Sequence, residues 1–300
     1  MASSNVCAVV LNWNSAQDTI ECVRSLRATG YPGLSIVVVD NASSDDSVTS
    51  IRSAVPDVHL LVQPSNGGYA SGNNAGIRWS LEHQADFVLV LNNDVTVEPD
   101  FIDRMLDCAG RHPKAGIIGG RVFYADQRER IFCGASYFSV CRCTGVNKGN
   151  LRARMQKHGR ERNVDYISGV LLFVRSQVFK DLGLFDERFF MYYEDLEFAR
   201  RVTKRFRIIY NPAATAYHKS GGGTGWRTYT DLYLYYQTRN RIWVFDSDPP
   251  LYRVYVAAFT IGITILKTIV ISLNFHGNPS GTKRQLGALW RGLRDGLFTS

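Results

Sequence analysis

The sequence lacks the signatures of several common classes of protein. Its six cysteines are scattered with no CxxC pair, and there is no internal repeat or low-complexity tract. It also has no zinc-finger spacing and no aromatic strand motif of an RNA-binding sheet, which argues against nucleic acid as a partner. Cys133, Cys141 and Cys143 with His158 are poorly spaced for zinc, so we expect packed free thiols in a reducing compartment.

Three glycine-rich phosphate loops are missing as well. The segment 11–15 (LNWNS), which follows the first strand-like run, contains no glycine, so an ordinary GxGxxG dinucleotide site is excluded. The Walker pattern GxxxxGK[ST] does not occur. The glycine- and arginine-rich loop expected of a sugar-nucleotide pyrophosphorylase is also absent from this position.

The composition is that of a folded protein with anionic partners. Hydrophobic residues make up 45% and aromatic residues 12% of the 300 residues, enough for a substantial core in one large α/β domain with room for an appendage. The formal net charge is +8 and the sequence pI is about 9.2. These values favour phosphate-bearing small molecules or an anionic membrane surface as partners.

Short apolar runs alternate with helical stretches over the first ninety residues or so. This is the pattern of βαβ units and a mainly parallel sheet. The expected strands are 6–11, 34–40, 58–62 and 87–91, and the expected helices are 16–28, 45–54 and 68–82.

After residue 94 the alternation breaks down. We expect helices at 99–110, 194–204 and 230–245, strands at 115–123, 166–174 and 206–210, and a hairpin over 131–146. The basic segment 147–163 is predicted to be a loop, either a solvated surface or a lid that meets substrate phosphates or lipid headgroups. The prolines at 249 and 250 suggest a boundary. The predicted domains are therefore 1–247, with halves 1–98 and 99–247, and a helical extension 248–300.

Residues 254–275 form an apolar run long enough to cross a bilayer. Lys267 interrupts the run, at a cost of roughly 2.5–3.5 kcal/mol if it lay at the bilayer centre. A buried helix, a helix in the membrane interface and a true span all remain open. Because basic residues follow at 283, 284, 291 and 294, we favour a helix that lies in the interface of an anionic membrane.

Polar residues stand at the ends of three of the expected strands. Asn12 follows the first strand, Asp40 ends the second, and Asn92 and Asp94 follow the fourth. Asn and Asp are common turn formers, so each alone carries little information. Because ligands gather at the carboxyl ends of parallel strands, the combination predicts a binding site there.

These stretches resemble glycosyltransferase family 2, and within it the bacterial rhamnosyltransferase-like enzymes of cell-surface polysaccharide synthesis. The similar segments are VVLNWNS at 9–15, VVVDNASSDDS at 37–47, NGGYASGNNAGI at 66–77, LNNDV at 91–95 and the long segment 168–201. The resemblance covers residues 5 to 245. It implies a GT-A fold, a Rossmann-like α/β architecture with a mixed, mainly parallel sheet flanked by helices, followed here by the C-terminal membrane-associating extension.

The resemblance implies a nucleoside site around Asp40. Its carboxylate would accept a hydrogen bond from N3–H of uracil or thymine, although a helix-capping role is the alternative. Asn12 would complete the cradle. Gly67 and Gly68 would allow close backbone approach at a helix N-terminus. Asn74 is a further candidate donor contact, with an ordinary helix-surface role as its alternative.

The resemblance also implies a diphosphate and metal site. Asn92-Asn93-Asp94 occupies the place of the family's DXD motif, with Asn92 in place of the first acid. Asp94 and His218 are the expected ligands of Mn²⁺ or Mg²⁺, and an imidazole ligand favours Mn²⁺. A structural role is the alternative for His218. Trp226 and Arg227 are expected to close over the donor.

Two acids open the expected helix at 194. Acids in a first helical turn also interact well with the helix dipole, which accounts for one of them. The resemblance selects Asp195 as the base that deprotonates the acceptor, with Glu194 orienting an acceptor hydroxyl. Asp186 is expected to belong to loop structure.

The predicted function is metal-dependent, inverting transfer from a UDP- or dTDP-sugar, with dTDP-rhamnose as one candidate. The acceptor would be a saccharide, carried on a polyprenyl diphosphate at the cytoplasmic face of the cell membrane. A homo-oligomer is compatible with the sequence. The alternatives are a non-catalytic nucleotide-sugar-binding or membrane scaffold protein and, less favoured, a sugar nucleotidyltransferase.

Overall fold

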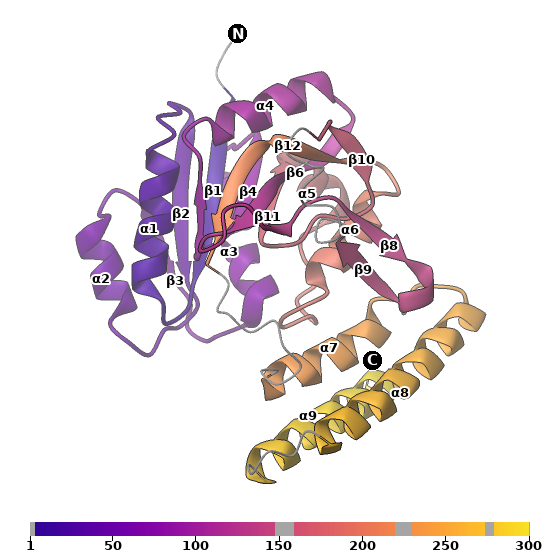
Figure 1. Ribbon diagram of the computed structural model, residues 1–300. Coiled ribbons are helices and arrows are strands. Elements are labelled where there is room, and N and C mark those ends of the chain that lie inside the picture. The colour runs from indigo at the N-terminus through magenta and orange to yellow at the C-terminus, as the bar shows by residue number, and fades with distance from the viewer. Residues whose placement is uncertain (1–3, 148–158, 220–229, 274–278, 300) are drawn as a thin grey trace. The chain divides into compact units, whose positions relative to one another are not determined.

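A computed structural model describes residues 4–147, 159–219, 230–273 and 279–299 (Figure 1). The chain divides into two compact units. The first consists of residues 1–138, 145–188 and 194–220, and the second of residues 139–144, 189–193 and 221–300. The first unit is α/β and the second is mainly helical. Trp226 and Arg227, and residues 148–158 of the basic segment, lie outside the described residues.

A ten-stranded sheet forms the centre of the first unit. Its strands are β1 (Val6–Asn12), β2 (Leu34–Asp40), β3 (His59–Val62), β4 (Phe87–Asn92), β5 (Val95–Val97), β6 (Ala115–Tyr124), β7 (Ile131–Cys133), β10 (Arg162–Val164), β11 (Leu171–Arg175) and β12 (Arg207–His218). Their order is β10-β12-β6-β11-β4-β1-β2-β3, with β5 on β12 and β7 on β6. Strands β3, β2, β1 and β4 are parallel, and β11 runs antiparallel between β4 and β6. The prediction of a mixed, mainly parallel sheet is confirmed.

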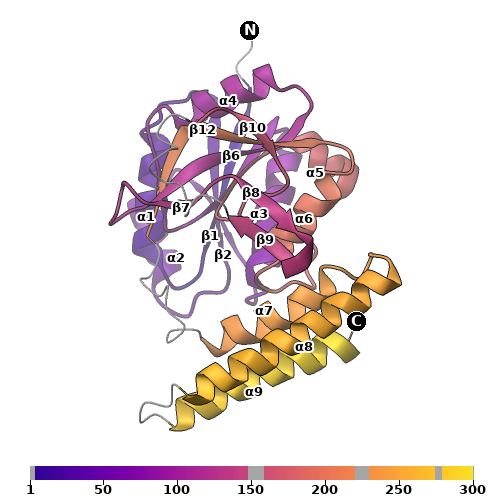
Figure 2. The ribbon, with the colours of Figure 1, turned by 45° about the vertical axis from the view of Figure 1, so that its right-hand side comes forward.

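Helices cover both faces of this sheet (Figure 2). They are α1 (Ala16–Arg27), α2 (Ser47–Ala54), α3 (Gly68–Glu82), α4 (Phe101–Arg111), α5 (Ser176–Leu182) and α6 (Glu194–Val202). Successive residues of β1 point to opposite faces, so Ala8 joins one buried cluster and Val9 the other. Helix α3 lies close to the sheet because Gly76 has no side chain. A Cβ there would lie 2.4 Å from Cγ1 of Val9.

Several predicted boundaries were wrong, each for a local reason. Strand β12 runs to His218 and not to Tyr210, because a register shift between Tyr210 and Thr215 lets it continue past Asn211-Pro212. Strand β11 starts at Leu171 and not at Tyr166, because a turn at Ser168 precedes it. Arg162 and Asn163 belong to β10 and not to a loop.

The expected hairpin over 131–146 is divided between two sheets. Strand β7 pairs with β6, whereas β8 (Ser136–Ser139) and β9 (Thr144–Asn147) form a separate two-stranded sheet. Apolar alternation alone did not distinguish these two pairings. Strand β5 and helix α5, which are short, were not expected at all.

The second unit is built around three helices, α7 (Asp231–Trp243), α8 (Pro250–Leu273) and α9 (Pro279–Phe298). Helix α9 packs tightly on α7, since a Cβ at Gly292 would lie 2.4 Å from the carbonyl oxygen of Tyr235. By length and composition α8 is able to cross a membrane. The predicted division at residue 247 falls between α7 and α8 and stays a prediction.

Candidate functional site

The sheet brings the predicted polar residues to one edge. Asn12 lies opposite Asp40 in the β1–β2 register, and Leu11 lies opposite Asn92 in the β1–β4 register. Because β1, β2 and β4 are parallel, all three carboxyl ends face the same side. The expected meeting of three strand ends is therefore present in the structure.

Asp40 and Asn12 form a closed hydrogen-bond network. Both residues are fully buried. Oδ1 of Asp40 accepts from Nδ2 of Asn12 (2.7 Å) and from Oγ of Ser43 (2.6 Å), and Oδ2 accepts from the backbone N–H of Ser43 (2.9 Å). Thr19 donates to Oδ1 of Asn12 (2.7 Å). Oδ2 of Asp40 thus accepts one hydrogen bond and is able to accept another.

The glycine loop is tied to the end of β2 by Asn41, a residue to which sequence reasoning gave no role in this loop. Nδ2 of Asn41 donates to Oδ1 of Asn66 (2.9 Å) and to the carbonyl of Gly68 (3.0 Å), and its Oδ1 accepts from the N–H of Gly67 (3.3 Å). Gly68 has a φ of +82°, which residues other than glycine rarely adopt. The loop is therefore held in the shape that opens α3.

Two other residues that were predicted to contact the nucleotide sugar use their side-chain amides to bind other parts of the protein. Nδ2 of Asn74 donates to the carbonyl of Phe185 (2.9 Å) and to Glu187 (2.9 Å), so both of its N–H groups hold the 185–187 segment. Nδ2 of Asn93 donates to Thr19 on α1 (3.0 Å). Contacts of Asn74 and Asn93 with the nucleotide sugar stay predictions. In the structure, both side chains make hydrogen bonds within the protein.

Asp94 and His218 face each other across β5 and β12. His218 pairs with Val95, and the N–H of Lys219 donates to the carbonyl of Asp94 (2.9 Å). Nε2 of His218 lies 3.1 Å from Oδ1 of Asp94. Two ligands, each about 2.1 Å from one octahedral ion, lie about 3 Å apart, so this pair has a spacing suited to a shared cation.

Buried polar atoms without partners gather around this pair. Among the described residues, Oδ1 of Asn92, Oδ1 of Asp94 and Nδ1 of His218 are buried and make no hydrogen bond. Buried polar groups are normally satisfied, and exceptions need a reason such as an ion or a ligand. The donor set of a carboxylate, an imidazole and an amide oxygen fits Mn²⁺ or Mg²⁺ completed by phosphate oxygens.

Asp195 is held by residues from a different part of the chain. Its Oδ2 accepts from the hydroxyl of Tyr166 (2.7 Å) and from the N–H of Gly169 (2.6 Å), and its Oδ1 accepts from the N–H of Leu196 (2.7 Å). A Cβ at Gly169 would lie 3.1 Å from Oδ2. Glycine at 169 therefore allows the backbone to approach the carboxylate closely.

Burial raises the pKa of both acids of this pair. The pKa of Asp195 is raised above its usual value by burial, against the lowering effect of its hydrogen bonds from Tyr166, Gly169 and Leu196. The pKa of Glu194 is raised well above its usual value, first by burial and then by the charge of Asp195. Oε2 of Glu194 is buried with no hydrogen-bond partner. The protonated form of Glu194 is thereby favoured.

Tyr69 connects helix α3 to the segment that holds Asp195. Its hydroxyl donates to the carbonyl of Gly169 (2.6 Å). Burial raises its pKa well above the usual value, and the charges of Glu194, Asp195 and Asp94 add to that rise.

The backbone links the candidate metal site to the acid pair. The N–H of Asn92 donates to the carbonyl of Val170, next to the Gly169 that holds Asp195. Sequence reasoning assigned no role to Tyr69, Tyr166 or Gly169. Tyr69 and Gly169 stand within the family-like segments 66–77 and 168–201, which were a signal for them.

A second cluster of metal-ligating side chains lies elsewhere in the first unit. Ligand atoms of Cys108, His112 and Glu161 lie within 4.8 Å of one another. Glu161, however, accepts from Arg111 (2.5 Å) and contacts Nε2 of His112 (2.8 Å). The arrangement is a satisfied hydrogen-bond cluster that anchors residue 161. The six cysteines are free thiols, as expected, and His158 lies outside the described residues.

Comparisons with known proteins identify the family of the chain. The model of the family "Glycosyl transferase family 2" matches residues 7–183. The chain is 31% identical over 223 residues to the N-acetylglucosaminyl-diphospho-decaprenol L-rhamnosyltransferase of Mycobacterium tuberculosis, a match covering 66% of this chain and 70% of that relative. It is 27% identical to the dTDP-rhamnosyl transferase RfbF of Shigella flexneri, over 66% of this chain and 63% of RfbF.

Two solved structures share the fold. A mannosyltransferase from Pyrobaculum calidifontis in complex with GDP-Man and Mn²⁺ superposes with a TM-score of 0.59 at 15% identity, over 98% of this chain and 87% of that chain. TarS (residues 1–349) of S. aureus in complex with UDP-GlcNAc gives a TM-score of 0.58 at 16% identity, over 97% and 81%. At this level of identity the likeness concerns the GT-A fold alone.

Proposed function

Because the chain belongs to glycosyl transferase family 2, we propose that it transfers a sugar, with inversion, from a UDP- or dTDP-sugar to a saccharide acceptor. The observation that carries this proposal is the backbone link between Asp195 and the strand that leads to Asp94: the N–H of Gly169 donates to Asp195, and the carbonyl of Val170 accepts from the N–H of Asn92. dTDP-rhamnose is the favoured donor because two relatives are named as rhamnosyltransferases, one of them for dTDP-rhamnose.

Asp195 is the catalytic base in this proposal. One of its carboxylate oxygens takes the proton of the acceptor hydroxyl while that oxygen attacks the anomeric carbon. The bond from that carbon to the diphosphate oxygen breaks, and the nucleoside diphosphate leaves. One base suffices for a single displacement, in contrast to the two carboxylates of a retaining glycosidase. A raised pKa suits this role because it strengthens the base.

Asp94 and His218 would hold the divalent cation, with Asn92 beside them as a neutral oxygen donor. When bound, the cation supplies positive charge to the leaving diphosphate. An imidazole ligand favours Mn²⁺ over Mg²⁺. The two protein ligands leave the remaining positions to phosphate oxygens and water, as is common for Mg²⁺ sites.

Asp40, Asn12 and the glycine loop would receive the nucleoside. The free acceptor capacity of Oδ2 of Asp40 suits an N3–H donor, but the residue must become accessible first, since it is fully buried. The backbone N–H groups at the start of α3 would face the phosphates. Trp226 and Arg227 remain candidates for closure over the donor.

The acceptor in this proposal is a glycan on a polyprenyl diphosphate, in cell-surface polysaccharide synthesis. The decaprenol-linked substrate in the name of the mycobacterial relative and the net charge of +8 support it. The enzyme would then work as a peripheral protein at the cytoplasmic face of the membrane.

A donor panel tests the proposal. Purified protein with Mn²⁺ is screened against UDP- and dTDP-sugars for thermal shift, donor hydrolysis and transfer to an N-acetylglucosaminyl diphosphate lipid. We expect transfer to fall by about a thousandfold in Asp195→Asn, a typical value for a lost general base, with donor affinity kept. Asp126→Asn, at an exposed acid, is the matched control.

Two results would contradict this function. Donor binding without any transfer or hydrolysis would favour the non-catalytic binding or scaffold protein. Release of pyrophosphate from a nucleoside triphosphate would favour the sugar nucleotidyltransferase.

A further inference from the structure

A helix on the surface of a soluble protein turns its apolar side to the core and its polar side to water. Helix α8 has the opposite arrangement. It buries Val256, Thr260 and Thr264 within the second unit, and their spacing of four places them on one stripe. Lys267, the one charged residue after Arg253, lies on the same stripe, where burial lowers its pKa to about 8. In the middle of α8 the polar side chains Thr260, Thr264 and Lys267 therefore face the neighbouring helices, whereas the exposed polar residues Arg253, Tyr255 and Ser272 lie near its ends.

The outward side of α8 is apolar along its length. Its exposed residues include Val254, Ile261, Ile265, Leu266 and Ile269, which we call the α8 apolar face. An 18-residue window of the helix has a mean hydropathy of 2.1, and only 17% of that window is buried. Twenty-four residues span about 36 Å at 1.5 Å per residue. An exposed apolar surface of this extent marks an interaction site.

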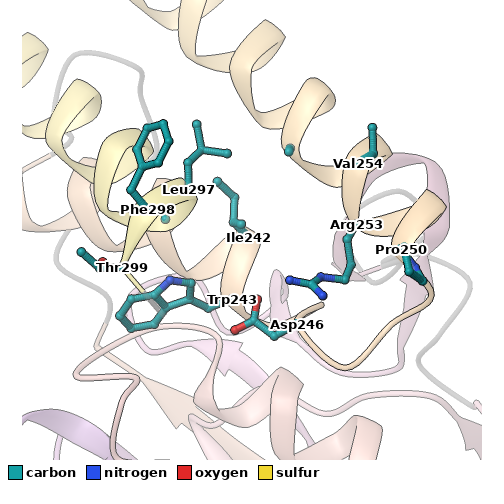
Figure 3. A pocket seen from close by; sticks show the side chains of 11 residues that line it. Ile242, Trp243, Asp246, Pro250, Arg253, Val254, Leu297, Phe298 and Thr299 are labelled. Atoms are coloured by element: carbon teal, nitrogen blue, oxygen red, sulfur yellow. The ribbon is translucent and has the colours of Figure 1, made fainter.

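The apolar face is hollowed near its first turn. A cavity of about 430 Å³ lies among the ends of the three helices, and Figure 3 shows its side chains. Ile242, Leu297 and Phe298 form an apolar wall opposite Val254, and the guanidinium of Arg253 points toward the carboxylate of Asp246. The exposed side chains of Val254 and Phe298 extend the apolar surface around it.

Positive charge surrounds this surface. From residue 250 to the end, the sequence has six basic residues and one acid, Asp295. Helix α9, which packs beside α8, exposes Arg284, Arg291 and Arg294. It also exposes Trp290, a residue type that is enriched at membrane interfaces. This excess of positive charge would repel a second copy of the same surface, whereas it complements an anionic lipid surface.

We propose that α8 lies flat in the headgroup region of an anionic bilayer, with the α8 apolar face among the acyl chains and the basic side chains of α9 on lipid phosphates. One side of α8 is already covered by protein, which suits a helix on a membrane rather than across it. The inference rests on the proposed function, in which the acceptor is carried by a membrane lipid.

Vesicle flotation tests the proposal. The full chain, purified without detergent, is mixed with vesicles of phosphatidylcholine alone or with phosphatidylglycerol. We expect flotation with the anionic vesicles and at least tenfold less with the neutral ones. The double variant Ile265→Glu, Leu266→Glu should lose at least tenfold in bound fraction. Val62→Glu is the matched control, since Val62 is 48% exposed and Ile265 is 47% exposed.

A second pair of substitutions tests the headgroup contacts. Arg291→Glu with Arg294→Glu should reduce flotation and weaken its dependence on salt. Unchanged melting temperatures show that the variants are folded. Equal flotation of the wild type and both double variants overturns the proposal. Two other results would also overturn the proposal. If the protein forms a dimer without lipid and the variant Ile265→Glu, Leu266→Glu dissociates it, the apolar face binds a second copy of the chain. If the protein is soluble only in detergent, α8 spans the membrane.

Transfer to a water-soluble acceptor, measured in parallel, separates this proposal from the proposed function. A wild-type protein that transfers the sugar but does not bind anionic vesicles refutes the docking surface alone. Vesicle binding without transfer refutes the enzyme alone.

Discussion

The two ends of the candidate site differ in how their polar atoms are satisfied. At the nucleoside end, the carboxylate of Asp40 accepts three hydrogen bonds and Asn12 is bonded at both ends of its amide. At the diphosphate end, atoms of Asn92, Asp94 and His218 are buried without hydrogen bonds. The first end is largely satisfied within the protein, with acceptor capacity left only on Oδ2 of Asp40, whereas the second leaves polar atoms for groups that the protein does not supply.

Under the proposed function, this difference distinguishes polar atoms that stabilise the ligand-free protein from polar atoms that are left for a ligand. An unsatisfied buried polar atom costs about 1–3 kcal/mol. Ligand oxygens and a cation at the diphosphate end would remove that cost, so the site is prepared for them at the expense of the ligand-free protein. The nucleoside end pays no such cost, and substitutions there should act on stability first.

The largest effect is expected at the diphosphate end, on metal-dependent donor binding. Asp94→Asn and His218→Ala each remove one ligand of the proposed cation site. We expect donor affinity in the presence of Mn²⁺ to fall by about a hundredfold, while affinity without metal is kept. Titration calorimetry with UDP and dTDP, with and without Mn²⁺, measures this. A loss of the same size without metal would contradict the assignment.

A stability measurement tests the comparison itself. Asp40→Asn turns an acceptor of three hydrogen bonds into a group that also donates, and should cost about 2 kcal/mol of unfolding free energy. Asp94→Asn should leave the stability of the ligand-free protein nearly unchanged, because Oδ1 of Asp94 makes no hydrogen bond that the substitution could remove. Denaturant unfolding of both variants decides the matter. Equal destabilisation by the two would remove the contrast between the ends.

The hydrogen bond from Tyr166 to Asp195 should appear in the pH–rate profile. This bond lowers the pKa of Asp195, so Tyr166→Phe raises that pKa further and moves the acidic limb of kcat to higher pH by about one unit. Tyr31→Phe is a matched control, since the Tyr31 hydroxyl donates to the carbonyl of Ser4. An unshifted limb would mean that Asp195 is not the titrating base.

The smallest effect is expected for Glu194 and concerns stability against pH. Because its pKa is raised well above the usual value in the folded state, the folded protein holds this proton more tightly than the unfolded chain. Its contribution to stability is therefore complete below about pH 4.3 and is lost as pH rises toward the folded pKa. Glu194→Gln cannot titrate, so its stability relative to the wild type should increase from pH 5 to pH 8. Melting temperatures across this range measure the difference.

The fold was predictable where side-chain periodicity is clear. The parallel strands β1, β2 and β4 are continuous apolar runs that end in Asn or Asp, and their register alone brings Asn12, Asp40 and Asn92 together. Strand β12 was cut short at Tyr210 because Asn211-Pro212 is typical of a break, and only tertiary contacts show that the strand continues to His218.

The types of residue in the candidate site were predictable from the sequence, but the directions in which their side chains point were not. Asp195 was expected, yet its partners Tyr166 and Gly169 lie 29 and 26 residues away and follow no periodic pattern. Asn74 and Asn93 stand in family-like segments, but the sequence cannot show that their amides turn toward Phe185 and Thr19. Side-chain direction depends on loops whose path the local sequence does not determine.

The dipeptide Gly169-Val170 works as a spacer of fixed length. The N–H of Gly169 donates to Asp195, the proposed base, and the carbonyl of Val170 accepts from Asn92 on the strand that leads to Asp94. In the proposed function, main-chain geometry would therefore set the distance between the base and the diphosphate site. Exchange of surrounding side chains can then alter which sugars are accepted without changing this distance. Efforts to retarget the enzyme should therefore keep residues 169 and 170 and diversify the walls around them.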